Sequence, residues 1–158
     1  MATIHLVHGF VACGKTTFSK ELEVKTGGLR LSLDDWTIGL TGEAVDLDRR
    51  LLDCVWNLLS DLWPKIATSG TRDVILDFGF WSRQRRDDAR ARAAAIGAKV
   101  ILYNVICPDD IARKRLRQRN RRGGSGYLID AEAYNSLQTE FEPLAPDEPL
   151  NLRDADRH

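Results

Sequence analysis

The chain contains little cysteine, and it lacks any long apolar run. Its cysteines, Cys13, Cys54 and Cys107, are odd in number and widely separated, and they show none of the paired spacings of a zinc site. We therefore expect reduced thiols, and neither a disulfide framework nor a structural metal. No apolar segment is long enough to span a bilayer, and no basic start followed by an apolar stretch marks a secretory leader. These absences predict a cytoplasmic protein with no membrane partner.

The chain also lacks an excess of either charge. Lys plus Arg and Asp plus Glu each number 23 among 158 residues. A balanced chain has no overall field with which to attract a general polyanion or a membrane surface. The length suits one α/β core and is too short for two, so we expect a single domain over residues 1–158.

What the chain does contain is a segment, Gly9 to Thr16, that fits the pattern G-x-x-x-x-G-K-[ST]. Its glycines let backbone amides turn inward onto phosphate, and Lys15 would place a charge between the β- and γ-phosphates of ATP. The Thr16 hydroxyl would bind the accompanying Mg²⁺. The segment lies between an apolar run and a helical pattern, so a chance lysine in a glycine-rich turn explains it less well. The residues predicted to bind the nucleotide are Gly9, Ala12, Cys13, Gly14, Lys15, Thr16 and Thr17.

Helical and extended patterns alternate along the rest of the chain. This alternation is typical of an α/β protein, here with the P-loop NTPase fold: a mostly parallel sheet with helices on both faces. Three prolines after residue 142 predict an irregular closing segment. The expected strands are 3–7, 29–33, 73–77 and 99–106, and the expected helices begin near 15, 46, 82, 108 and 130 and end near 27, 64, 97, 122 and 142.

Three aspartates follow two of the expected strands. Ligands of an open α/β sheet bind beyond the carboxyl ends of its strands, so Asp34, Asp35 and Asp77 should face the phosphate loop. Asp34 or Asp35 could orient an acceptor hydroxyl and take its proton, and Asp77 could hold the metal through water. The structural alternatives are an Asx turn or helix cap for the adjacent pair, and bonds to the turn after its strand for Asp77.

A basic run occupies residues 113–122, where seven of ten side chains are cationic, and glycines follow it. Such a helix end and loop, 113–128, could close as a lid and bring guanidinium groups to the transferring phosphoryl group. A solvated basic face and an RNA-binding patch are the alternatives. No aromatic side chains are interleaved with the run to stack on bases, which disfavours nucleic acid.

These features together resemble the small P-loop kinases of the zeta-toxin and polynucleotide 5′-hydroxyl kinase group, whose bacterial members are often labelled AAA-type ATP-binding proteins. The resemblance covers most of the chain. It implies that Asp34, rather than Asp35, is the general base, and that Arg119 and Arg122 contact nucleotide and transition state. Thr37 replaces the basic residue expected after the aromatic, which argues against a polynucleotide end as acceptor. The motifs concerned are 9–16, Asp34-Asp35-Trp36, 77–81, and Arg115 with Arg119-Asn120.

The sequence thus predicts an ATP-dependent kinase that uses Mg²⁺ and moves the γ-phosphate to a hydroxyl. Lys15, Asp34 and Arg122 are the predicted catalytic residues, and Thr16 and Asp77 are the predicted metal ligands. The acceptor stays open between a small molecule and a polynucleotide 5′-hydroxyl. The alternative function is an ATP-binding switch or slow ATPase that acts through a partner, which needs no base at the second strand end.

Overall fold

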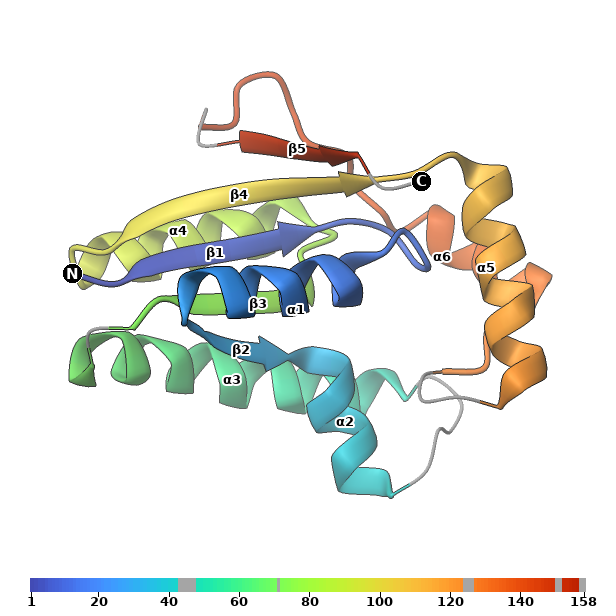
Figure 1. Ribbon diagram of the computed structural model, residues 1–158, viewed down its shortest axis with the longest axis horizontal. Coiled ribbons are helices and arrows are strands. Elements are labelled where there is room, and N and C mark those ends of the chain that lie inside the picture. Colours follow the sequence, from blue (N-terminus) through green and yellow to red (C-terminus); the bar gives the residue numbers. More distant parts are fainter. Residues whose placement is uncertain (43–47, 71, 124–126, 150–151, 157–158) are drawn as a thin grey trace.

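The computed structural model describes residues 1–42, 48–70, 72–123, 127–149 and, for the backbone, 152–156. Its sheet has five strands in the order β2-β3-β1-β4-β5, and every neighbouring pair is parallel (Figure 1). Parallel pairing makes all the carboxyl ends meet at one edge of the sheet. The strands are β1 (Thr3–His8), β2 (Leu29–Ser32), β3 (Val74–Gly79), β4 (Lys99–Ile106) and β5 (Leu152–Asp156).

Helices cover both faces of the sheet, so the predicted α/β class is confirmed. Successive side chains of a strand point to opposite faces, and β1 shows the consequence. Val7 packs with Leu22 of α1 (Lys15–Thr26) on one face. Leu6 belongs to the core on the other face, with side chains of α3 (Arg49–Ser69) and α4 (Arg83–Ala95). Beyond the carboxyl edge lie α5 (Asp109–Arg122) and α6 (Ala131–Gln138) (Figure 1).

A short helix, α2 (Leu33–Thr41), follows β2 directly and was not predicted. The Ser32 hydroxyl caps it by accepting from the Asp35 amide at 3.2 Å, and Gly42 ends it in the left-handed region at φ 74°. Asp34 and Asp35 occupy its first turn, where negative charge is favourable. The aspartate pair therefore belongs to a helix N-terminus rather than to a strand end.

Helix α3 continues through Pro64, where the sequence predicted its end. A proline in a helix lacks the amide that would bond the carbonyl four residues earlier, here that of Ser60. Arg92 of α4 supplies the missing donor, with Nη1 at 3.0 Å from the Ser60 oxygen. The expected start near residue 46 lies outside the described residues. The described helix begins at Arg49, capped by the Asp48 carboxylate.

The C-terminal part differs from the prediction in two ways. Asp130 caps α6 as expected, but that helix ends at Gln138 and not near residue 142. The closing segment is not wholly irregular either. Its last described residues form β5, which extends the sheet beside β4 with a register from Leu102↔Leu152 to Ile106↔Asp156.

A buried ion pair joins α4 to the segment after α6. Arg86 is completely buried, and its guanidinium donates to both carboxylate oxygens of Glu148, at 2.6 and 2.9 Å. It also donates to the carbonyls of Phe80 and Glu142, at 2.9 and 3.1 Å. Burial alone would raise the pKa of Glu148, but the bonds from Arg86 and its neighbours lower it to about 2.

We expect Glu148→Gln to destabilise the protein by about 3–5 kcal/mol at neutral pH, because the Arg86 charge would stay buried without its counter-ion. The lowered pKa means that this stabilisation is complete above pH about 4.5 and is lost as pH falls toward about 2. Urea unfolding at a series of pH values measures both effects. Glu142→Gln, at an exposed position nearby, is the control. A pH-independent loss below about 1 kcal/mol would contradict the assignment.

Candidate functional site

The phosphate loop is held by its first glycine. The Gly9 amide donates to the Gly79 carbonyl at 3.2 Å, and a Cβ on Gly9 would lie 2.6 Å from the carbonyl oxygen of Val105. Any other residue would therefore push the loop away from the ends of β3 and β4. Ala12 and Gly14 have positive φ angles of 59° and 94°, which turn successive amides toward one side of the loop. Gly14 is also the N-cap of α1, so the positive end of that helix faces the same space.

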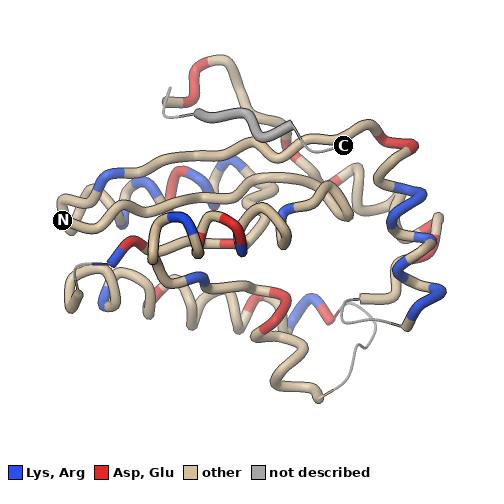
Figure 2. The backbone as a smooth tube through the Cα atoms, viewed as in Figure 1, with Lys and Arg blue, Asp and Glu red and all other residues tan. Residues whose placement is uncertain are grey.

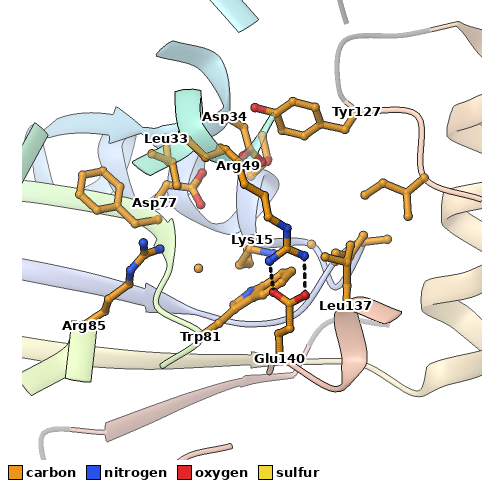
Figure 3. Close-up of a pocket in the computed structure, with 18 of the residues that line it drawn as sticks. Lys15, Leu33, Asp34, Arg49, Asp77, Trp81, Arg85, Tyr127, Leu137 and Glu140 are labelled. Carbon is orange, nitrogen blue, oxygen red and sulfur yellow. Dashed lines mark hydrogen bonds and ion pairs between the residues drawn. The ribbon is translucent and has the colours of Figure 1, made fainter. Parts of the chain in front are cut away.

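Lys15 extends back over this loop. Its ammonium group donates to the Phe10 carbonyl at 2.6 Å. Figure 3 shows it facing a pocket of about 1120 Å³, whose wall also includes Thr16 and Thr17. The loop, the lysine and the hydroxyl predicted to bind Mg²⁺ thus meet at one end of the pocket.

Asp34 lines the same pocket from the first turn of α2. Its side chain is open to the pocket, but the surrounding walls reduce its hydration and raise its pKa. The positive charges of Lys15 and Arg119 act in the opposite direction, and the Asp77 carboxylate adds to the rise. A carboxylate so placed can accept a proton near the phosphate end of the pocket.

Asp35 has a different environment from its neighbour. It is exposed, it does not line the pocket, and its carboxylate accepts from Arg30 Nη1 at 2.9 Å. Its amide bonds the Ser32 cap. The two adjacent aspartates therefore separate into one that faces the pocket and one held by an arginine outside it.

Asp77 lies within β3 and lines the pocket near Thr16. Its Oδ2 accepts from Ser19 Oγ at 2.7 Å and from Arg30 Nη2 at 2.6 Å. Arg30 was not predicted, because it precedes Asp77 by 47 residues and only strand pairing brings them together. Burial lowers the pKa of Arg30, but the charges of Asp77 and Asp35 and the hydrogen bonds to both together raise it overall.

The metal ligands predicted from the sequence, Thr16 and Asp77, can contribute one oxygen each. Within the described ranges, no three His, Cys, Asp or Glu side chains gather in a group that could bind a metal. Mg²⁺ in nucleotide sites takes most of its ligands from phosphates and water, so a threonine hydroxyl and one carboxylate suit it.

The basic run forms α5, along which Lys and Arg positions recur (Figure 2). Arg115 and Arg119 line the pocket, whereas Arg122 is exposed at the end of the helix and does not. Arg119 Nη2 donates to the Tyr127 carbonyl at 3.2 Å, and burial lowers the pKa of Arg119. The helix ends at Arg122 with Gly123 as its C-cap at φ 60°. Of the glycines predicted as hinges, Gly124 and Gly126 lie outside the described residues.

Two predicted nucleotide-binding residues support the loop rather than line the pocket. Gly9 lets the backbone of the loop lie close to Gly79 and Val105. Cys13 is buried, and its sulfur lies 3.2 Å from that of Cys107 at the end of β4, with both thiols free. Burial and this contact raise the pKa of Cys107 to about 12, so it stays protonated.

The rest of the pocket wall contains residues to which the sequence analysis assigned no individual role. They come from four separate parts of the chain, and no local pattern connects them. Two of them, Arg49 and Glu140, are 91 positions apart in the sequence and form an exposed ion pair. These residues are Arg49, Leu52, Trp81, Arg85, Tyr127 and Glu140.

Known proteins share this architecture. A family model described as an AAA domain matches residues 4–144. A sugar kinase from Janibacter sp. superposes with a TM-score of 0.69 at 18% identity, covering 99% of this chain and 86% of that one. A gluconokinase from Sinorhizobium meliloti gives 0.67 at 14%, covering 98% and 82%, and Chaetomium thermophilum Kti12 in complex with ADP-AlF3 gives 0.74 at 18%, covering 97% and 88%. Identities this low show the shared fold. No curated protein sequence matches the chain.

Within the described part of the chain, no helix is both long and apolar enough to cross a membrane.

We expect Lys15→Ala to weaken ATP–Mg²⁺ binding about tenfold to a hundredfold, because a charge-assisted bond to phosphate contributes about 1.5–3 kcal/mol. Calorimetric titration measures the affinity, and circular dichroism checks that the fold is retained. Lys20→Ala, on the exposed face of α1, is the matched control and should bind normally. Unchanged affinity in a folded Lys15→Ala protein would refute the site.

Proposed function

Because this chain belongs to the AAA domain family, and because a phosphate loop shares a pocket with an aspartate, we propose that it is an ATP-dependent kinase that phosphorylates a hydroxyl group. The membership agrees with the resemblance to AAA-type ATP-binding proteins predicted from the sequence. The fold shared with a sugar kinase and a gluconokinase supports the reaction class. The observation that carries the proposal is that Asp34 lines one pocket with Lys15 and Arg119, whose charges both act on its pKa.

In the proposed reaction the acceptor oxygen attacks the γ-phosphorus of ATP, and the bond from that phosphorus to the β–γ bridging oxygen breaks. Asp34 takes the hydroxyl proton as the new phosphorus–oxygen bond forms, and ADP leaves. Lys15 and the loop amides hold the phosphates, while Arg119 approaches from α5 to balance the charge of the transferring group.

Mg²⁺ would be held by Thr16 and Asp77 together with phosphate oxygens. When bound, it neutralises charge on the β- and γ-phosphates. Arg30 holds the Asp77 carboxylate in place at the pocket wall, because its Nη2 and the Ser19 hydroxyl both bond the same carboxylate oxygen. Arg122 is the weakest of the proposed catalytic residues, since it would need movement of α5 to reach the phosphates.

We expect Asp34→Asn to lower phosphotransfer about 100-fold to 10,000-fold while ATP affinity stays nearly unchanged. Asparagine keeps the size of the side chain but cannot take the proton. Asp35→Asn is the matched control and should retain most activity, because Asp35 bonds Arg30 outside the pocket. Transfer and calorimetric ATP binding are measured for both variants. A larger loss in Asp35→Asn would move the role to that residue, and ATP hydrolysis without transfer in wild type would favour the slow ATPase.

The pH dependence gives a separate prediction. The base must be ionised, so transfer should rise with pH through a limb above the ordinary aspartate pKa of about 3.9, since the Asp34 pKa is raised. The Arg119 charge lowers that pKa, so Arg119→Gln should move the limb to higher pH as well as reduce the rate. Arg117→Gln, exposed on the same helix, should leave the limb in place. An acid limb that does not shift in Arg119→Gln would contradict the proximity of Arg119 to the base.

A further inference from the structure

The pocket has two chemically different ends. The donor end consists of the phosphate loop with Lys15 and Thr16. The rest of the wall, here called the acceptor end, combines the indole ring of Trp81, which contacts the loop, with Arg49, Arg85 and Glu140 (Figure 3) and with the Asp53 carboxylate. ATP bound at the loop would leave this second end for the acceptor, with Asp34 between the two. The side chains that matter there are those of Arg49, Asp53, Trp81, Arg85, Tyr127 and Glu140.

The arginines of the acceptor end are already paired with carboxylates. Arg49 donates through both terminal nitrogens to Glu140, with Nη1 at 2.6 Å from Oε2 (Figure 3). Arg85 donates to Asp53 at 2.8 Å, and its guanidinium also lies over the ring of Trp56. An anionic acceptor that binds the two terminal nitrogens of Arg49 would have to displace the Glu140 carboxylate from them. A neutral acceptor can bond the same groups without breaking them.

The Tyr127 hydroxyl supplies a donor without an assigned acceptor. Tyr127 is 6% exposed, and among the described residues its hydroxyl makes no hydrogen bond of ordinary length, although the Thr37 side chain lies near enough to lower its pKa. It points toward Asp34 in Figure 3. Burial and the Asp34 charge raise its pKa to about 12, so the hydroxyl is protonated at neutral pH and can donate. A buried donor left unpaired is costly, and a ligand oxygen would satisfy it.

Trp81 provides a fixed apolar surface beside these polar groups. Its Nε1 donates to the Gly9 carbonyl at 3.0 Å, and its ring packs against Phe10 and Phe141 at centroid distances of 5.2 and 6.1 Å. These contacts hold the indole at the wall of the pocket. A flat ring next to paired carboxylate and guanidinium groups suits a ligand that has apolar C–H faces and several hydroxyls.

Resting on the kinase function above, we propose that the acceptor is a small uncharged polyhydroxyl compound, a sugar or polyol. Its C–H face lies on Trp81, its remote hydroxyls bond the Arg49–Glu140 pair, and Tyr127 donates to an oxygen near the hydroxyl that Asp34 deprotonates. Tyr127 is thus a specificity-determining residue. A polynucleotide end carries phosphates next to its 5′-hydroxyl, and a sugar acid carries a carboxylate, so both would meet the Glu140 carboxylate at Arg49 and are disfavoured there.

The first test compares acceptors by transfer of labelled γ-phosphate from ATP. The panel contains uncharged pentoses, hexoses and hexitols, one six-carbon sugar acid, and a 5′-hydroxyl oligonucleotide, with ATP hydrolysis followed in parallel. We expect an uncharged member to exceed the sugar acid and the oligonucleotide by about 100-fold in kcat/KM. Preference for either charged acceptor would overturn the acceptor class and leave the kinase function standing. Hydrolysis to phosphate with no labelled acceptor would overturn both.

The second test uses variants of the acceptor end with the preferred uncharged acceptor. Tyr127→Phe should raise the acceptor KM about three- to tenfold and leave the ATP KM unchanged. Tyr103→Phe also removes a tyrosine hydroxyl, but one bonded to His5 outside the pocket, and it should leave both constants unchanged. Glu140→Gln should weaken the uncharged acceptor at least tenfold and improve the sugar acid, because Arg49 loses its anionic partner. An unchanged acceptor KM in both pocket variants would overturn the proposed contacts.

Discussion

The close approach of Gly9 to the ends of β3 and β4 is the contact on which the site depends. The Gly9 amide bonds Gly79, and its α-carbon leaves no room for a side chain beneath the Val105 carbonyl. Asp77 precedes Gly79 by two residues in β3, and the lid helix begins four residues after Val105. One glycine therefore brings the phosphate loop, the carboxylate proposed to hold the metal and the start of the proposed lid helix α5 into a single arrangement.

Arg30 separates the roles of three aspartates. It bonds Asp35 outside the pocket and Asp77 at its wall, so both carboxylates have a fixed cation. Asp34 has no such partner among the described residues, and its pKa rises as a result of its enclosure and its acidic neighbour. A carboxylate bonded to an arginine suits a metal ligand or a structural contact better than it suits a base. A carboxylate with a raised pKa suits proton transfer. The charges thus distinguish residues that look equivalent in the sequence.

The phosphate loop could be predicted because its function lies in the backbone of eight consecutive residues. The alternation of strands and helices could also be predicted, because each element shows in the pattern of neighbouring residues. This alternation in turn indicated a parallel sheet. The helix that carries Asp34 was missed because it is short and begins directly after a strand. The end predicted for α3 at Pro64 was wrong, because Arg92 of α4 bonds the Ser60 carbonyl that the proline leaves without an amide donor. The C-terminal strand β5 was missed because three prolines before it indicated irregular structure.

The acceptor end could be predicted only in part. Trp81 and Tyr127 fell within the predicted 77–81 motif and 113–128 lid without a role of their own, and the Arg49–Glu140 pair, which joins positions 91 residues apart, was not predicted. Such residues meet only because α3, the β3–α4 connection and the segment around α6 converge at the carboxyl edge of the sheet. A phosphate loop binds the phosphates of its nucleotide with one short segment, whereas an acceptor pocket is assembled from distant segments. The sequence therefore indicates the donor more directly than the acceptor.

The central claim is that donor phosphate and acceptor hydroxyl meet at Asp34. It is tested most directly by a crystal structure of the protein with ADP, aluminium fluoride, Mg²⁺ and the acceptor identified in transfer assays. We predict that an acceptor oxygen lies about 3 Å from the Asp34 carboxylate and in line with the leaving oxygen of ADP, since a general base must reach the proton it removes. An acceptor oxygen bonded by another group, or a water molecule in its place with Asp34 turned away, would contradict the account.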